Sequence, residues 1–146
     1  MKFDIKKRIK EVLEKGYVMS LSTRDKNGVW CSDVIYIFDS DLNIYWFSDP
    51  EARHSKAIHK NKQVAGTITV SRLGENDLGI QFSGYAERLK GRRWDLCVKH
   101  LRKCCKIVPK KAIDVLQGDC WYALHPEKFG LIDEKNFGWD RQEVRL

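Results

Sequence analysis

The residues with the clearest chemical potential lie between positions 50 and 60. Asp49 followed by Pro50 predicts the start of a short helix, with the aspartate as N-cap and the proline in the first helical position. Because a helix N-terminus carries a positive partial charge, cations in its first turn are unfavourable unless an anion lies beside them. Backbone N–H groups and neighbouring side chains would then form a phosphate site. The side chains that would take part are Arg53, Ser55 and Lys56, assisted by His54.

A second interpretation of the same residues is a solvated basic helix face that ends near Lys60, with Glu51 as a local charge partner. Composition alone favours this interpretation, because mixed exposed charges are ordinary on the surface of a globular domain.

A second group of reactive side chains is Cys97, His100 and Cys104, which fall on one face of an expected helix. They could bind a metal or carry thiol chemistry. A buried apolar stripe is favoured instead, since free cysteine is often buried and the sequence has no Cys-x-x-Cys pair. Cys31 could be a redox partner of a cofactor, but it is expected to pack inside the fold as a small strand residue.

Length and charge limit the classes of protein that fit. The chain has 146 residues, which predicts one domain over residues 1–146. Apolar runs fall short of the ~20 residues of a membrane-spanning helix, and the first residues do not resemble a signal peptide. We therefore expect a cytoplasmic protein with five reduced cysteines and no membrane partner. The net charge of +7 fits an anionic partner, such as a phosphorylated cofactor, nucleic acid or a membrane surface, and fits an ordinary basic surface about equally well.

The elements that would position these residues begin with an amphipathic helix between a cap at Asp4 and an end at Gly16. Its apolar stripe consists of Ile5, Ile9, Val12 and Leu13. Asn27-Gly28 then predicts a hairpin turn between the first two strands. The expected strands are residues 17–23, 29–38, 44–47, 63–71, 79–89, 121–124 and 129–133, with one more in the tail from residue 137; further helices are expected at residues 91–105 and 110–116.

This order of elements predicts the fold class. Mostly antiparallel strands with hairpin turns and a few short helices are typical of a mainly β fold, here a small closed β-barrel with helices packed outside. His125-Pro126 is expected to form a bulge or turn within the late strands.

Three stretches together resemble the pyridoxamine 5′-phosphate oxidase-like family. Residues 44–54 read Ile-Tyr-Trp-Phe-Ser-Asp-Pro-Glu-Ala-Arg-His, Asn61-Lys62-Gln63-Val64 follows, and residues 82–89 read Phe-Ser-Gly-Tyr-Ala-Glu-Arg-Leu. The likeness covers about residues 15–90 and is closest to a small, uncharacterised bacterial branch. The resemblance implies a split β-barrel that binds FMN at the interface of a homodimer.

The resemblance also implies which residues contact FMN. The phosphate would be held by the residues of the short helix, while strand residues touch the ribityl chain or the ring and two later residues approach the flavin. The phosphate set is Arg53, His54, Ser55 and Lys56, the strand set is Phe47, Ser48, Val34 and Ile35, and the later residues are Gln81 and Arg141.

Departures from the family pattern limit the function. Ser32 and Ile37 stand where the oxidases direct an arginine and a lysine at FMN, which implies modest affinity. Phe137 and Trp139 stand where the oxidases carry the arginine and histidine that hold pyridoxamine phosphate. The chain is therefore not expected to be a genuine pyridoxamine phosphate oxidase, and an aromatic substrate or none is favoured.

The favoured hypothesis is an FMN-dependent oxidoreductase of unknown small-molecule substrate, in which no catalytic acid or base stands out. The alternative is a non-catalytic flavin or haem carrier, since a fold does not fix a function. A basic barrel that binds nucleic acid is less favoured, because the aromatic residues fall within strand runs and are expected to fill the barrel.

Overall fold

Helix α1 (Ile5–Lys15) forms as the sequence predicts. The side chain of Asp4 accepts a hydrogen bond from the backbone N–H of Lys7 at 3.0 Å, which satisfies one free donor of the first turn. The helix ends at Gly16, whose φ of −71° is not left-handed. Glycine is needed there for space, because a Cβ would overlap the hydroxyl of Tyr36. That hydroxyl donates to the carbonyl oxygen of Leu13 at 2.7 Å, so it holds the helix end against the sheet.

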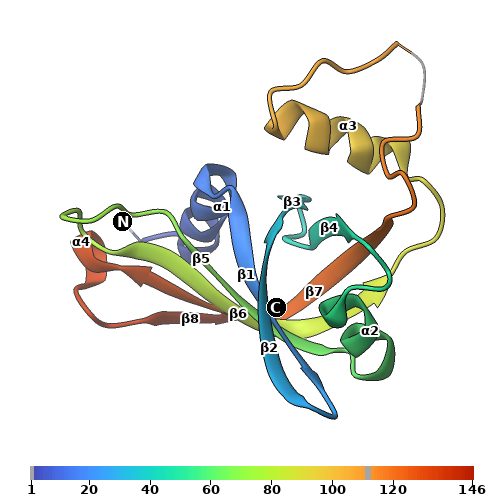
Figure 1. The fold of residues 1–146 in the computed structure, drawn as a ribbon. Helices are drawn as coiled ribbons and strands as arrows, with labels where there is room; N and C mark the ends of the chain where they lie inside the picture. The colour runs from blue at the N-terminus through green and yellow to red at the C-terminus, as the bar shows by residue number, and fades with distance from the viewer. Residues whose placement is uncertain (1, 111–112) are drawn as a thin grey trace.

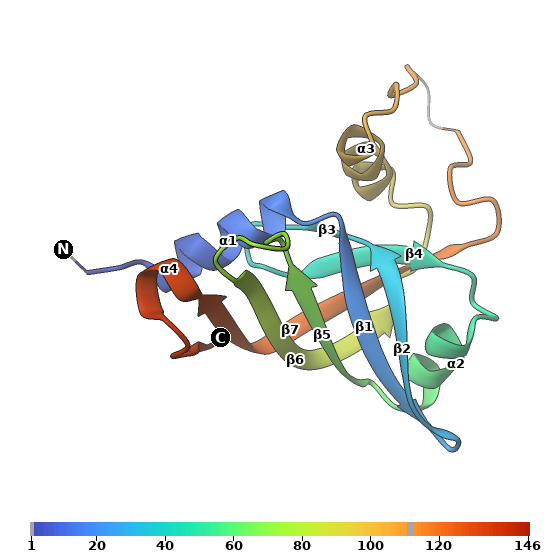
Figure 2. The same cartoon turned by 60° about the vertical axis from the view of Figure 1, so that its left-hand side comes forward.

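The sheet consists of eight antiparallel strands in the described residues, 2–110 and 113–146 of the computed structural model. Their order is β2-β1-β5-β6-β7-β4-β3, and β8 pairs with β7. Figures 1 and 2 show how the sheet curls around its apolar face. The strands are β1 (Val18–Asp25), β2 (Gly28–Ile35), β3 (Ile37–Phe38), β4 (Ile44–Ser48), β5 (Gln63–Thr69), β6 (Leu78–Arg88), β7 (Cys120–Asp133) and β8 (Gln142–Arg145).

The barrel is split at Tyr36. The expected long strand over residues 29–38 is divided there, because β2 pairs with β1 whereas β3 pairs with β4. The hairpin between β1 and β2 is confirmed, but its turn occupies Lys26 and Asn27, and Gly28 takes the positive φ of 109° as the first residue of β2. The first and last strands of the order, β2 and β3, are thus consecutive in the sequence and are joined through Tyr36.

The two late strands expected on either side of His125-Pro126 are one continuous strand, β7. The expected bulge is confirmed, since the register against β6 shifts between Ser83 and Gly84, opposite Lys128 and Pro126. The bulge leaves Glu127 out of the ladder, while Pro126 stays in register opposite Gly84.

The remaining helices differ from the prediction at their ends. Helix α3 (Trp94–Lys103) begins three residues later than expected, after Arg93 in a left-handed conformation. Residues 113–116 are not helical, and the rest of that predicted helix includes positions 111 and 112, which lie outside the described residues. A short helix α4 (Glu134–Phe137) precedes β8 and was not expected.

Apolar side chains form two separate clusters. The larger one fills the curl of the sheet under α1 and includes Tyr36 and Trp46. The smaller one lies under α3 and contains Ile37, Leu96, Cys97, Leu116 and Trp121. In both views α3 stands apart from the rest of the barrel (Figures 1 and 2). No helix in the described part of the chain is long and apolar enough to cross a membrane.

Candidate functional site

Helix α2 (Arg53–Lys60) starts later than the sequence predicts. The expected cap at Asp49 and first helical position at Pro50 are wrong, because the Asp49 carboxylate accepts from the N–H of Glu51 at 2.9 Å and closes a turn before the helix. Ala52 is the N-cap and offers no side-chain acceptor. The first-turn N–H groups of α2 therefore lack a side-chain cap.

Ser55 is the third residue of this uncapped turn. Its side chain is 3% exposed, yet its Oγ has no hydrogen-bond partner among the described residues. A buried hydroxyl without a partner costs free energy, so such a group in a native fold calls for an explanation. Ser55 also lines the groove described below.

Arg53 is the first residue of α2 and is bound within the chain. Its Nε and Nη2 donate to the two carboxylate oxygens of Asp25 at 3.0 and 3.2 Å. The guanidinium carbon also lies 4.4 Å from the centroid of the Trp30 ring, in cation–π range. The neighbouring guanidinium, by donating to Asp25, lowers the pKa of that carboxyl. A carboxylate thus occupies the donors that a phosphate would use.

His54 and Ser48, which the sequence assigns to one site, are brought together. The His54 Nε2 lies 3.0 Å from the Ser48 Oγ. Burial lowers the pKa of His54, because the charged imidazolium is poorly solvated there. The imidazole is therefore neutral near neutral pH, and it can contribute a hydrogen bond rather than the positive charge considered from the sequence.

Lys56 pairs with Glu51, with 3.1 Å between Nζ and Oε2. Both side chains are mostly exposed, and an exposed pair of this kind contributes little to stability. The ammonium can therefore turn to another anion at small cost.

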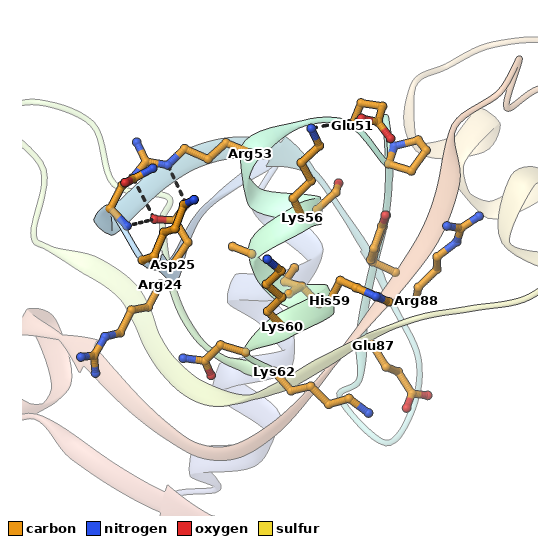
Figure 3. A pocket seen from close by; sticks show the side chains of 18 residues that line it. Arg24, Asp25, Glu51, Arg53, Lys56, His59, Lys60, Lys62, Glu87 and Arg88 are labelled. Atoms are coloured by element: carbon orange, nitrogen blue, oxygen red, sulfur yellow. Dashed lines mark hydrogen bonds and ion pairs between the residues drawn. The ribbon is translucent and has the colours of Figure 1, made fainter.

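Arg53, Ser55 and Lys56 border an open groove of about 1300 Å³, and its lining among the described residues does not include His54 or Ser48. Its walls come from the tip of the β1–β2 hairpin, from the segment Pro50–Lys62 and from the ends of β6 and β7, as Figure 3 shows. Seven lysines and arginines line it against three carboxylates, so its lining carries a formal charge of +4. An arrangement with this charge and a free hydroxyl can hold an anion.

The other predicted contacts lie elsewhere in the subunit. Gln81 and Arg141 form one pair, with 3.0 Å between Nη1 of the arginine and Oε1 of the glutamine. They line a second, smaller cleft, and the α2 groove does not include them. β8, which follows Arg141, lies at the opposite end of the sheet from α2 in Figures 1 and 2.

Three strand residues of the predicted site are not on the groove either. Val34 is buried in the large apolar cluster, and Ile35 is the last residue of β2. Phe47 packs under α3, with its ring 4.6 Å from that of His100 and 5.1 Å from that of Trp121.

Part of the cysteine and histidine group on α3 packs against the smaller apolar cluster, through Cys97 within it and His100 beside Phe47. Cys97 and His100 are buried, and Cys104 Sγ lies 3.7 Å from His100 Nε2. No cluster of three metal-ligating side chains occurs among residues 2–110 and 113–146. All five cysteines are free. The expectation that Cys31 packs inside the fold is wrong, because it lies exposed on the edge strand β2.

Sequence reasoning missed the partners that complete the groove. Asp25 comes from the hairpin and was not assigned to the site. Arg24, Lys60, Lys62 and Arg88 also line the groove, although they are spread over 64 positions of the chain. Lys60 and Lys62 are close in the sequence, so they alone gave a local signal of a basic site. Arg24 and Arg88 are far from them in the sequence and reach the groove through the pairing of the strands.

The sequence has relatives, although no family model matches it. It is 34% identical to a UPF0306 protein from Photorhabdus laumondii over 88 residues, which cover 58% of this chain and 61% of the relative. It is 30% identical over 90 residues to the UPF0306 protein YhbP from Escherichia coli, 58% of each chain. The matches therefore span about three-fifths of the length of these relatives.

Solved structures share the fold at low sequence identity. Protein Rv2991 from Mycobacterium tuberculosis has a TM-score of 0.80 at 10% identity and covers 99% of this chain and 92% of its own. A Listeria innocua protein named after pyridoxamine 5′-phosphate oxidase has a TM-score of 0.68 at 12% identity, with 88% and 98% covered. The heme storage protein HutZ from Vibrio cholerae has 0.66 at 16%, with 90% and 95% covered. These likenesses confirm the predicted mainly β, split-barrel fold.

Proposed function

We propose that this chain binds FMN with its phosphate at the start of α2 and acts as a flavin-dependent oxidoreductase. The observation that carries the proposal is Ser55, a buried hydroxyl without a partner in the first turn of an uncapped helix that borders a basic groove. A phosphate would accept from the Ser55 Oγ and from the first-turn N–H groups. The residues present therefore fit the phosphate end of the cofactor.

The neighbouring side chains would complete this end. Lys56 would exchange its exposed contact with Glu51 for a contact with the phosphate. Arg53 would also bind the phosphate, in competition with its present partner Asp25. The neutral His54 would orient Ser48 through their 3.0 Å contact. When bound, FMN supplies the electron-transfer chemistry, and the protein supplies binding and orientation.

A homodimer is part of the proposal. Within one subunit the Gln81–Arg141 pair and the α2 groove line different clefts, so a second copy is needed to bring both to one flavin. Exposed apolar residues on the β1–β2 hairpin support an interface, with Val29 73% and Trp30 46% exposed. A self-complementary contact of this kind is typical of twofold dimers.

Titration with FMN and riboflavin tests the phosphate site. A hydrogen bond to a charged group contributes about 1.5–3 kcal/mol, so Ser55→Ala is expected to weaken FMN binding roughly tenfold or more. Riboflavin lacks the phosphate, and its affinity is expected to stay unchanged. Ser40→Ala, in the exposed turn before β4, is the control with the same atom removed. Equal losses for both ligands in Ser55→Ala would contradict the proposal.

A carrier that binds haem is the alternative, supported by the shared fold of HutZ and by the neutral imidazole of His54, the form that binds iron. The visible spectrum of the purified protein separates the two, since flavin gives two bands and haem a Soret band. We expect the flavin spectrum after incubation with FMN, and negligible oxidation of pyridoxamine phosphate by the loaded protein. A Soret band retained through purification would favour the haem carrier.

A further inference from the structure

The groove continues beyond the proposed phosphate site, toward the C-terminal end of α2. Four basic side chains lie there, which we call the distal basic cluster: Arg24, Lys60, Lys62 and Arg88. In Figure 3, Lys60 and Lys62 lie between Arg24 on one side and Arg88 on the other. The carbonyl oxygen of Lys62 accepts from the N–H of Ala86 at 2.8 Å, which fixes this end of the groove against β6.

The distal basic cluster differs from the phosphate site in its charge balance. Arg53 and Lys56 each have a carboxylate partner, at 3.0 and 3.1 Å. Within residues 2–110 and 113–146, no member of the distal basic cluster forms an ion pair or a side-chain hydrogen bond. The 18 lining residues hold +4 of the chain's net charge of +7. Clustered cations without counter-charges repel one another and attract an anion.

The spacing along α2 sets the size of the ligand. Arg53 and Lys60 are seven residues apart, and a helix rises 1.5 Å per residue, so their backbone positions lie about 10 Å apart along the axis of α2. One phosphate group cannot contact both ends. A single ligand that reaches both must carry two separate anionic groups.

We propose that the distal basic cluster binds the second anionic group, a phosphate or carboxylate, of an extended ligand whose first phosphate lies at the start of α2. The proposal takes from the proposed function only the phosphate site at the start of α2. FMN has one phosphate, so the extended ligand is a different molecule, which would compete with FMN for that site. Once one end is bound, the second group is held near its site at a high effective concentration, so even exposed lysines add measurable affinity.

A nucleic acid is also an extended polyanion, but the groove favours a small molecule. Binding of single strands uses exposed aromatic rings on which bases stack. Among the described residues, the groove lining contains a single Phe, Tyr or Trp side chain, Tyr122, which is 3% exposed. The exposed ring of Trp30 lies beside the groove, but the guanidinium of Arg53 is already stacked on it at 4.4 Å. The phosphates of a nucleic acid would find cations here, but its bases would find no free ring in the groove lining.

Calorimetric titration of the full chain with synthetic phosphates tests the proposal. The probes are hexyl phosphate, with one anionic group, and hexanediol bisphosphate, with one at each end. We expect the bisphosphate to bind at least tenfold tighter to the wild type. The double variant Lys60→Gln/Lys62→Gln is expected to remove this preference and to leave hexyl phosphate unchanged. Lys6→Gln/Lys10→Gln, which removes two exposed charges from α1, is the matched control and is expected to keep the preference.

The proposal would be overturned if the two probes bound the wild type with equal affinity, or if both lost affinity equally in Lys60→Gln/Lys62→Gln. It would also be overturned if a single-stranded oligothymidylate bound tighter than the bisphosphate and lost affinity in that variant. Ser55→Ala separates this proposal from the proposed function. If hexyl phosphate binds Ser55→Ala as well as wild type while the bisphosphate preference persists, the phosphate site fails and the distal basic cluster stands.

Discussion

Asp25 has an unusual position for a residue of a ligand site, because its carboxylate holds the arginine that a ligand phosphate would use. The bidentate contact to Arg53 ties the tip of the β1–β2 hairpin to the start of α2. Such a carboxylate acts as an internal competitor, and binding of an anion must break the contact or share the guanidinium.

Asp25→Asn is therefore expected to tighten FMN binding, by roughly two- to fivefold as judged from exposed ion pairs. The amide keeps the shape of the side chain but leaves the guanidinium without its charged partner. Fluorescence titration with FMN measures the change, and Asp41→Asn, in the exposed turn before β4, is the control with the same charge change. Unchanged or weaker binding in Asp25→Asn would show that Arg53 does not contact the phosphate.

Two histidines predict how stability depends on pH. Burial lowers the pKa of His54 and, with nearby Lys106 and Lys103, that of His100. The unfolded chain therefore binds more protons than the folded one once the pH falls below the usual histidine pKa of about 6.5. The free energy of unfolding is expected to decrease from about pH 7 downward, until the pH passes the lowered values of the folded state.

Urea denaturation at a series of pH values measures this dependence. The variant His54→Gln/His100→Gln is expected to flatten the loss of stability between about pH 7 and pH 5. The control is His59→Gln, because His59 is exposed on α2. The same slope in the double variant and the wild type would assign the acid sensitivity to carboxylates instead.

At the scale of elements, the sequence was sufficient to predict a helix or turn where nearby residues supply its hydrogen-bond partners. Helix α1 could be predicted because Asp4 caps its first turn. The β1–β2 hairpin could be predicted because Gly28 takes the positive φ that follows its turn. The start of α2 could not, because the same Asp49-Pro50 signal also fits a turn. The carboxylate of Asp49, four residues before the helix, accepts from the N–H of Glu51.

Pairing across the sheet accounts for the other differences. The proline in β7 suggested two strands, but a bulge opposite Gly84 accommodates it within one. The candidate site was predicted in part: the sequence found Arg53, Ser55 and Lys56, whereas Asp25 and Arg88 reach the groove only through tertiary contacts. Gln81 and Arg141 were each expected to approach the flavin; in the structure they contact each other and line a different cleft from the α2 groove.

Gly16→Ala tests the packing of α1 on the sheet. A Cβ there would overlap the Tyr36 hydroxyl and crowd Ile68, so a loss of stability of about 1–3 kcal/mol is expected. Thermal denaturation of Gly16→Ala, Tyr36→Phe and the double variant measures the coupling. The double variant is expected to lose less than the sum of the single ones, because the hydroxyl is then absent. Additive losses would place the strain elsewhere, for example at Ile68.

For the whole molecule, the placement of the proposed flavin contacts in two different clefts of one subunit predicts a dimer. If the Gln81–Arg141 pair and the α2 groove meet on one flavin, the chain must be a dimer in solution. Light scattering at micromolar concentrations is expected to give twice the chain mass of 17.1 kDa. Arg141→Ala is expected to weaken binding of FMN while the mass stays the same. A mass of one chain together with tight FMN binding would contradict the shared site.

The separate apolar cluster under α3 has a consequence for amide hydrogen exchange. Leu96 and Cys97 pack on Trp121 rather than in the barrel core, so α3 can open while the strands stay paired. Its amides are expected to exchange through local opening at rates insensitive to denaturant, whereas those of β7, which pairs with three strands, exchange only on global unfolding. The chain would then carry two cooperative units of different stability, the helix α3 (Trp94–Lys103) and a persistent barrel that holds the groove.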